Sequence, residues 1–279
     1  RCRKGRPLMS DLHEWISLLL RWSHAIAGIM WIGQTYLFNW MEKAFDPPKD
    51  TAAKPNISGE LWMVHGGGFY LVEKQKWPEI MPRTLHWFKW EAMLTWLSGF
   101  MLLALIYWSG ASLLDYGSIL PRWQAVLISI GSLIAAVAIY RMIWKTPLGR
   151  SETLGGIAWY LILLASGAGL MRLLSDRAAY LHVGAMMGTV MVTNVWMTII
   201  PNQRKIMAIS EAGGAPRPEL ALQAKRCSKH NTLMSMPLLF TMLSNHYPSI
   251  TFGGTHPLLV LALLLLLGAY AAHLIREHA

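Results

Sequence analysis

Histidine is the residue type in this chain that could support metal or proton chemistry. The chain has ten histidines but only two cysteines, Cys2 and Cys227, which lie far apart and form no CxxC, CxxCH or zinc-binding spacing. The sequence therefore encodes neither a disulfide framework nor covalent haem attachment. Any metal bound by this chain must use histidine.

Two histidines lie inside long apolar stretches, where an ionisable group is costly and usually has a partner or a function. His24 stands in RWSHAIAGIMWIG, with Gly28 one helical turn further along the same face. His182 stands in LHVGAMMGTVMVTNVW, followed closely by Gly184. A flat porphyrin needs an imidazole for its iron and small residues beside it, so these stretches predict haem b with His24 and His182 as ligands. Zinc or copper is disfavoured because no third soft or carboxylate ligand is evident nearby.

Both features have alternative interpretations. Gly184 and Gly188 form a GxxxG motif, which also indicates close helix packing. A histidine near a helix end often lies in the membrane interface or bonds a backbone carbonyl. His246, near the end of the apolar run KHNTLMSMPLLFTMLSNHYP, is a reserve haem ligand. It lies about 24 Å from His230 along a helix, so these two histidines cannot bind one metal ion.

The elements that carry these residues are predicted membrane spans. Hydrophobic residues make up 54% of the 279 residues and charged residues only 14%, and several apolar stretches reach the roughly 20 residues that cross a bilayer. We therefore predict an all-α, polytopic transmembrane helix bundle. The seven expected spans are Glu14–Met41, Leu85–Trp108, Trp123–Trp144, Leu154–Leu173, Ala179–Ile200, Asn231–Asn245 and His256–His273.

Lysine and arginine in the loops predict the orientation. They are concentrated after the first, third and fifth spans, and basic loops stay in the cytoplasm, so the chain should start outside and end inside. The long loop at about residues 42–84 is then cytoplasmic. Residues 1–8 contradict this pattern and Met9 is a natural initiator, so we expect a non-native or disordered start before a membrane domain over residues 9–279.

The net charge of +10 arises largely from these basic loop residues. The basic residues are spread over separate loops without a nucleic-acid-binding motif. The charge therefore indicates membrane topology and contact with anionic lipids of the bilayer, and no nucleic-acid partner is expected.

Four stretches of the sequence carry a resemblance to a known family. HAIAGIMWIG, HGGGFYLVEKQKWPEIMPRTLHWFKWEAMLTWLSGF, LHVGAMMGTVMVTNVWMTIIPNQRKIMA and KHNTLMSMPLLFTMLSNHYP resemble the membrane domain of the cytochrome-linked bacterial urate oxidase, or urate hydroxylase, of the PuuD type. The resemblance covers nearly everything after Met9. It implies a multi-pass enzyme of purine catabolism in the bacterial inner membrane that oxidises urate to 5-hydroxyisourate.

The resemblance also implies the electron acceptor. In that family electrons pass to a C-terminal cytochrome c domain rather than directly to oxygen, and haem c belongs to that domain. This chain departs from the pattern, because it stops at Ala279, before an expected eighth helix and before any CxxCH. Either the chain is truncated or the cytochrome c is a separate partner.

A site for urate can be sought among the residues of the cytoplasmic layer. Urate is a planar monoanion, so its site needs cationic or amide donors, an aromatic or apolar wall and a base. Lys89 and Glu91 lie beside His86 in HWFKWEAMLTW, and His230 with Asn231 enters at the same level. We take these five residues as the catalytic candidates.

The loop HGGGFYLVEKQ can close over that site, because its glycines let backbone approach a flat ligand. In the alternative interpretation, Lys89 and Glu91 pair or snorkel at the interface and the glycines form a tight turn.

Two other functions remain open at this point. A proton-coupled permease would use the histidines as a proton relay, although no inverted repeat and no paired broken helices are evident. The pattern HxxxGxxWxG in the first span also resembles membrane haem proteins such as the bacterial protoporphyrinogen oxidase, which would keep haem and change the substrate. The remaining stretches favour the urate family.

Overall fold

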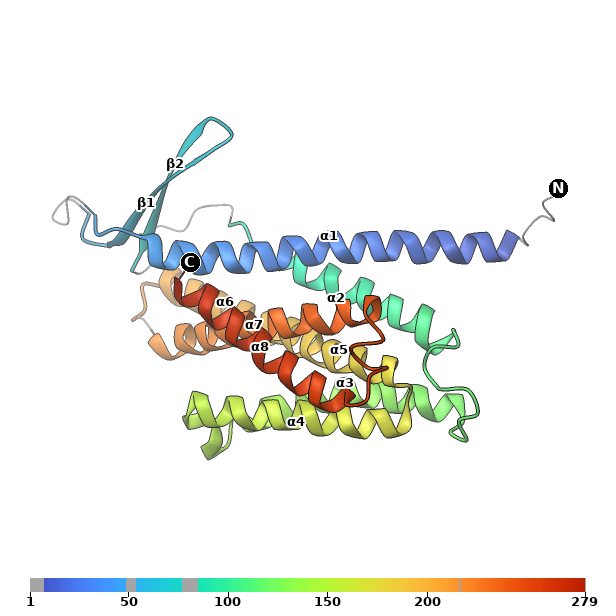
Figure 1. The fold of residues 1–279 in the computed structure, drawn as a ribbon. Helices are drawn as coiled ribbons and strands as arrows, with labels where there is room; N and C mark the ends of the chain where they lie inside the picture. The colour runs from blue at the N-terminus through green and yellow to red at the C-terminus, as the bar shows by residue number, and fades with distance from the viewer. Residues whose placement is uncertain (1–7, 49–53, 77–84, 216, 279) are drawn as a thin grey trace.

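The computed structural model describes residues 8–48, 54–76, 85–215 and 217–278, and these residues form a helix bundle with one projecting β-hairpin (Figure 1). The expected non-native start lies outside the described residues, except for Leu8, where the first helix begins. The α-helices are α1 (Leu8–Ala44), α2 (Trp90–Leu103), α3 (Arg122–Ile143), α4 (Glu152–Leu173), α5 (Asp176–Asn194), α6 (Ile200–Glu211), α7 (Pro218–Leu243) and α8 (Pro257–His278).

Short helical turns of other types extend these helices. The π-helical turn η1 (Ala104–Trp108) continues α2, and the π-helical turn η3 (Val195–Ile199) joins α5 to α6 in one helical segment. The 3-10 turns η2 (Pro147–Arg150) and η4 (Ser244–His246) precede α4 and follow α7.

Six helical segments of the described chain are long and apolar enough to cross a membrane. They match six of the seven predicted spans, and the predicted all-α transmembrane bundle is confirmed as a fold class. The six segments are Asp11–Ala44, Trp90–Trp108, Arg122–Ile143, Glu152–Leu173, Asp176–Glu211 and Pro257–His278.

The sixth expected span, Asn231–Asn245, is the one without a match and lies mostly in α7. That helix begins at Pro218, well before the expected start, and charged and polar residues run through its first half. Because of these residues α7 is not apolar enough to count among the candidate spans. It packs against α5 and α8 within the bundle instead.

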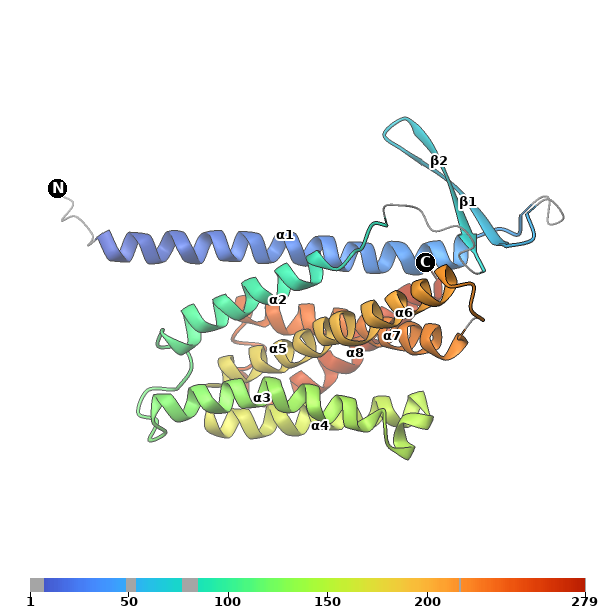
Figure 2. The same cartoon turned by 180° about the vertical axis from the view of Figure 1, so that it is seen from behind.

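The helices run side by side, and the bundle has two distinct ends (Figures 1 and 2). At one end α1, α3 and α8 end, α2, α4 and α7 begin, and the hairpin projects. We call it the hairpin end, and we call the opposite end, where α5 and α8 begin, the far end. The segment Asp176–Glu211 is the most buried of the candidate spans, with 56% of its apolar window buried, whereas α1 lies along the outside with 6%.

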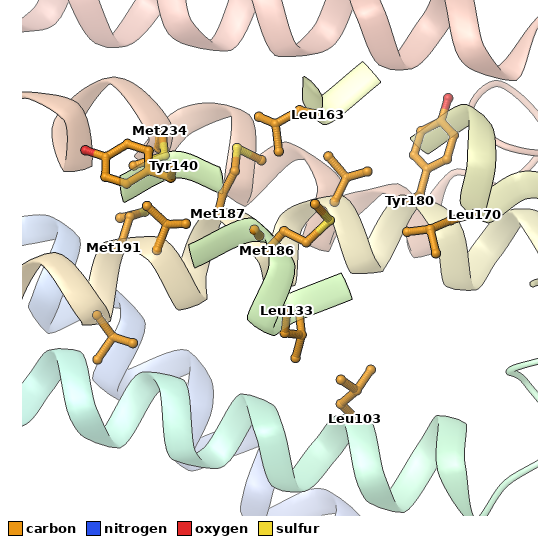
Figure 3. Packing of buried hydrophobic residues seen from close by; sticks show 14 of the residues in the cluster. Leu103, Leu133, Tyr140, Leu163, Leu170, Tyr180, Met186, Met187, Met191 and Met234 are labelled. Carbon is orange, nitrogen blue, oxygen red and sulfur yellow. The ribbon is translucent and has the colours of Figure 1, made fainter. Parts of the chain in front are cut away.

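Methionine fills much of the space between the helices. Met186, Met187 and Met191 of α5 and Met234 of α7 lie between Tyr140 and Tyr180 in the core (Figure 3). An unbranched thioether side chain adapts to irregular gaps, so these residues suit a bundle whose helices cross at different distances.

Glycines set the closest helix contacts. A Cβ atom on Gly268 of α8 would lie 2.7 Å from the backbone nitrogen of Pro237 in α7. A Cβ atom on Gly184 would lie 2.1 Å from Thr241 Oγ1, and one on Gly188 would lie 3.3 Å from Leu238 Cδ1. The GxxxG motif of α5 therefore packs against α7, which is its helix-packing interpretation.

The expected loop at residues 42–84 contains an antiparallel hairpin of β1 (Ile57–His65) and β2 (Gly68–Gln75). Gly66 and Gly67 form its turn with φ of 58° and 80°, the left-handed conformation that a two-residue hairpin turn needs. The hairpin projects away from the helices in both views (Figures 1 and 2). The prediction that these glycines close over a ligand beside Lys89 is therefore wrong, and the tight-turn interpretation holds.

Candidate functional site

A buried polar cluster lies between α3, α5 and α7, towards the hairpin end. Tyr140 Oη lies 2.7 Å from His230 Nδ1, and Asn194 Nδ2 donates to Tyr140 Oη at 3.1 Å. Asn194 Nδ2 also donates to Asn231 Oδ1 at 2.9 Å, and Asn231 Nδ2 donates to the carbonyl oxygen of Met191 at 3.0 Å. We call Tyr140, Asn194, His230 and Asn231 the Tyr140 cluster; all four are buried.

The hydrogen bonds of the cluster indicate the tautomer of His230. Because Asn194 donates to the Tyr140 oxygen, the Tyr140 hydroxyl hydrogen is left to donate to His230 Nδ1. A neutral imidazole that accepts at Nδ1 carries its hydrogen on Nε2. This assignment follows from the network, and it makes His230 a donor at Nε2.

Two tryptophans lie against the cluster. The Trp144 ring stacks on His230 with centroids 4.2 Å apart, and the Trp159 ring meets Tyr140 edge-on at 5.3 Å. Both indole Nε1 atoms are buried, and neither has an acceptor among the residues that the structure describes. A buried donor without an acceptor costs free energy, and Trp196 Nε1, outside the cavity lining, is a third such group among the described residues.

A cavity of about 440 Å³ adjoins these rings between α3, α4, α7 and α8. This volume falls in the range of small-molecule sites, which are mostly apolar with a few convergent polar groups. Tyr140, Trp144, Trp159 and His230 line it, and the ion pair of Lys229 with Glu152 lies at its hairpin end.

A second positive charge lies close to the cavity wall. The Arg226 guanidinium lies 5.5 Å from the centroid of the Trp144 ring, within the range of a cation–π contact. The cavity thus offers flat aromatic walls, the His230 ring and nearby cations. This combination suits a planar, acceptor-rich anion.

Two of the five catalytic candidates, His230 and Asn231, are brought together here. Sequence reasoning missed Tyr140, Trp144, Trp159 and Asn194. Asn194 could have been found in the same way as His182, because it is a polar residue inside an apolar span. An aromatic residue at a helix end is expected at the membrane interface, so it does not point to a site.

Lys89 is held in a different place. Its Nζ lies 5.8, 5.5 and 5.4 Å from the ring centroids of Trp87, Trp90 and Trp196, which is cation–π geometry. Trp196 belongs to η3 and faces α2, whereas Asn194 of the same helix bonds residues of α3 and α7. The contacts of Lys89 and of the Tyr140 cluster therefore lie on different sides of the α5–η3 segment.

The other two catalytic candidates also lie apart from the Tyr140 cluster. Glu91 Oε1 accepts from Gln34 Nε2 of α1 at 3.4 Å, and its buried Oε2 has no partner among the described residues. His86 lies before α2 and is exposed. The structure thus separates the predicted catalytic set into two groups.

His24 faces α2. Its Nδ1 lies 2.9 Å from the carbonyl oxygen of Thr95 and 3.2 Å from Ser98 Oγ, and a Cβ atom on Gly99 would lie 2.8 Å from its Cε1. Gly28 faces the same helix, because a Cβ atom there would lie 3.8 Å from Thr95 Cγ2.

His182 faces α3 and is fully buried. Its Nδ1 lies 2.6 Å from the carbonyl oxygen of Ala178 and its Nε2 lies 2.6 Å from Ser129 Oγ, so both ring nitrogens are hydrogen-bonded. His246, the reserve ligand, is exposed in η4 at the far end.

These positions do not fit one bis-histidine haem b. His24 and His182 face different helices, α2 lies between α1 and α5 (Figures 1 and 2), and neither nitrogen of His182 is left for an iron. Gly184 lies against Thr241 of α7 instead of beside a porphyrin. We therefore derive no step of a reaction through haem b.

A comparison with known protein families gives one match. The family model described as "Urate oxidase N-terminal" matches residues 10–279, which is nearly the whole chain. No curated protein and no solved structure matches the chain.

Proposed function

The chain belongs to the urate oxidase N-terminal family, and on this premise we propose that it is a membrane-bound oxidoreductase that oxidises urate to 5-hydroxyisourate. Urate would bind in the cavity beside His230. The observation that carries this placement is the cavity itself, where the rings of Tyr140, Trp144 and Trp159 lie beside His230. Urate is planar and rich in carbonyl oxygens, so it suits flat aromatic walls and an imidazole donor.

Each residue of the cavity has a role in this proposal. Trp144 and Trp159 cover the faces of urate, and His230 donates to it from Nε2. Tyr140 orients His230 by donating to Nδ1, so Tyr140 acts as a positioning residue. The charges of Lys229 and Arg226 attract the anion.

The reaction itself balances with water and two electrons. Urate and one water molecule give 5-hydroxyisourate, two protons and two electrons. The carbon that gains the hydroxyl group is oxidised, and two molecules of ferricytochrome c are each reduced by one electron. The two protons are released to solvent.

The proposed location follows from the loop charges. If the basic loops stay inside, the hairpin end faces the cytoplasm, where urate is made, and the cavity lies on that side of a bacterial inner membrane. The cytochrome c acceptor is either a further domain or a separate partner, and haem c belongs to it.

The test uses the purified chain in lipid nanodiscs, with urate and added ferricytochrome c under anaerobic conditions. We expect urate consumption to be coupled to cytochrome c reduction in a ratio of one to two. Trp159→Phe reduces one aromatic wall and should raise the urate KM roughly five-fold, the effect of about 1 kcal/mol, with kcat nearly unchanged.

Trp123→Phe is the matched control, because Trp123 is exposed at the start of α3 and distant from the cavity lining. Its urate KM should equal that of the unaltered chain. Equal KM values for all three proteins would remove the cavity as the urate site. Urate consumption without cytochrome c reduction would remove the proposed acceptor.

A further inference from the structure

The β-hairpin carries apolar side chains on both of its faces. On one face Trp62 pairs with Leu71 and Val64 pairs with Phe69. On the other face Leu61 pairs with Val72 and Met63 pairs with Tyr70. Alternate residues of a strand point to opposite faces, so a hairpin in water would normally show one polar face.

The first face is left uncovered by the rest of the described chain. Phe69 is 80% exposed, Trp62 and Val64 are each 67% exposed, and Leu71 is 43% exposed. An isolated two-stranded hairpin is marginally stable in water, and a contiguous exposed apolar patch normally marks a contact with a partner or a membrane. We call residues 62–71 the hairpin tip.

The base of the hairpin, in contrast, is charged and fixed. Lys54 Nζ donates to Glu60 at 2.7 Å and to Glu73 at 2.5 Å, and these hydrogen bonds raise the pKa of Lys54 and keep it protonated. Lys74 Nζ donates to Glu42 of α1 at 2.6 Å.

Backbone contacts add to this anchor. Asp46 and Glu60 exchange backbone hydrogen bonds of 3.0 and 2.9 Å, and a Cβ atom on Gly59 would lie 2.7 Å from Phe45 Cβ. The direction of the hairpin is therefore set by the end of α1.

That direction carries the tip back over α1 instead of beyond its end. The hairpin rises beside the end of α1 and leans back over α1 in both views (Figures 1 and 2). Since α1 is a candidate span with little buried surface, its outer side faces lipid at this level. The hairpin tip thus lies over a lipid-facing surface, and its charged base lies at the end of the span.

We propose that the hairpin tip inserts into the lipid leaflet at the hairpin end, as a membrane anchor beside the spans. Aromatic rings such as Trp62 and Tyr70 prefer the headgroup boundary, and Phe69 and Val64 at the turn reach the acyl chains. Lys74 and Lys76 at the base carry positive charge that complements anionic headgroups. This proposal does not depend on the substrate.

The test measures the depth of single labelled positions. Both native cysteines are replaced by serine, and an environment-sensitive nitrobenzoxadiazole label is attached at Phe69→Cys or Val64→Cys at the tip. Gln75→Cys at the exposed base is the control. The full chain is placed in nanodiscs of phosphatidylcholine and phosphatidylglycerol, one copy per disc.

We expect nitroxide-bearing lipids to quench the tip labels several-fold more than the base label, and aqueous iodide to quench the base label several-fold more than the tip labels. Equal iodide quenching of tip and base would place the tip in water and overturn the proposal. A tip shielded from both quenchers would be covered by protein, which would also overturn it.

A second arm separates lipid from a second copy of the chain. If lipid quenching of the tip labels is lost in discs that hold two copies, the tip is an interface between copies and the proposal fails. If Phe69→Cys gives less folded protein than the unaltered chain on size-exclusion chromatography, the quenching comparison uses Val64→Cys alone.

Discussion

At the residue scale, the hydroxyl group of Tyr140 in α3 links side chains of α5 and α7. It accepts from Asn194 of α5 and shares a hydrogen bond with His230 Nδ1 of α7, and both partners are buried. When a buried hydrogen-bonding group loses its partner, the free-energy cost exceeds the net stabilisation that the hydrogen bond had supplied.

Tyr140→Phe removes this hydroxyl and leaves His230 Nδ1 without its donor. We expect the free energy of unfolding to fall by about 1–3 kcal/mol, and urate to bind more weakly because the tautomer of His230 is no longer fixed. Thermal unfolding and urate titration of the purified protein measure the two effects. Tyr270→Phe, at an exposed position of α8, should change neither. Unchanged urate affinity in Tyr140→Phe would show that His230 does not donate to urate.

For Lys89, in contrast to Tyr140, we expect a substitution to leave urate binding almost unchanged. Its ammonium group lies among three indole rings and shares no contact with the Tyr140 cluster. Lys89→Met should therefore lower thermal stability slightly, by about 0.5–1 kcal/mol for the lost cation–π contacts, and leave the urate KM within two-fold. A several-fold rise in KM would transfer the substrate to the Lys89 side of the bundle.

The separation of Lys89 from His230 could not be read from the sequence. The sequence predicts that both residues lie at the same level of the membrane, because level depends on the distance from the span ends. The side of a helix on which a residue lies depends on which helices pack against each other, and apolar spans carry little amphipathic pattern to indicate this. His24 and His182 were separated for the same reason.

At the element scale, the contact of α7 with α8 depends on one glycine. Pro237 cannot donate a backbone hydrogen bond inside α7, and Gly268 of α8 lies directly against its backbone. Backbone atoms cannot rotate away as a side chain can.

Gly268→Ala should therefore lower the thermal unfolding midpoint by several degrees, the result of a clash worth about 1–3 kcal/mol. Gly131→Ala in α3 is the matched control, since a Cβ atom there meets nothing within 4 Å. It should leave the midpoint unchanged or raise it slightly, because alanine favours a helix. Equal midpoints in the two variants would contradict the close α7–α8 contact.

The sequence predicted six of the candidate spans but not the hairpin or the start of α7. Long apolar runs identify spans directly. The hairpin lacks the strict alternation of a half-buried strand, because apolar residues occupy both faces. The first half of α7 is polar and basic, and it bonds α6 through Asn202, which donates to Leu220 and Gln223, a contact that no local pattern reveals.

At the scale of the whole molecule, the two ends of the bundle should lie on opposite sides of the membrane. Basic loops cluster at the hairpin end, and the positive-inside rule then predicts that this end is cytoplasmic. Tyr116 lies fully exposed in the loop after η1 at the far end, and Ala212 lies exposed after α6 at the hairpin end.

Cysteine labelling tests this orientation. In a chain without its native cysteines, Tyr116→Cys should react with a membrane-impermeant maleimide in intact spheroplasts, whereas Ala212→Cys should react only after lysis. Equal labelling before lysis, or the reverse order, would contradict the predicted topology.

The exposed position of α1 has a consequence for biosynthesis. A helix of 37 residues is about 55 Å long, and little of the apolar window of α1 is buried by protein, so α1 needs few protein neighbours. It can leave the translocon and settle in the bilayer as soon as it is made. The segment Asp176–Glu211 cannot settle in the bilayer in this way. Its buried Asn194 amide bonds Asn231, which is synthesised later. A nascent chain arrested before α7 should therefore hold α1 stably in the membrane while its fifth span stays bound to insertion chaperones.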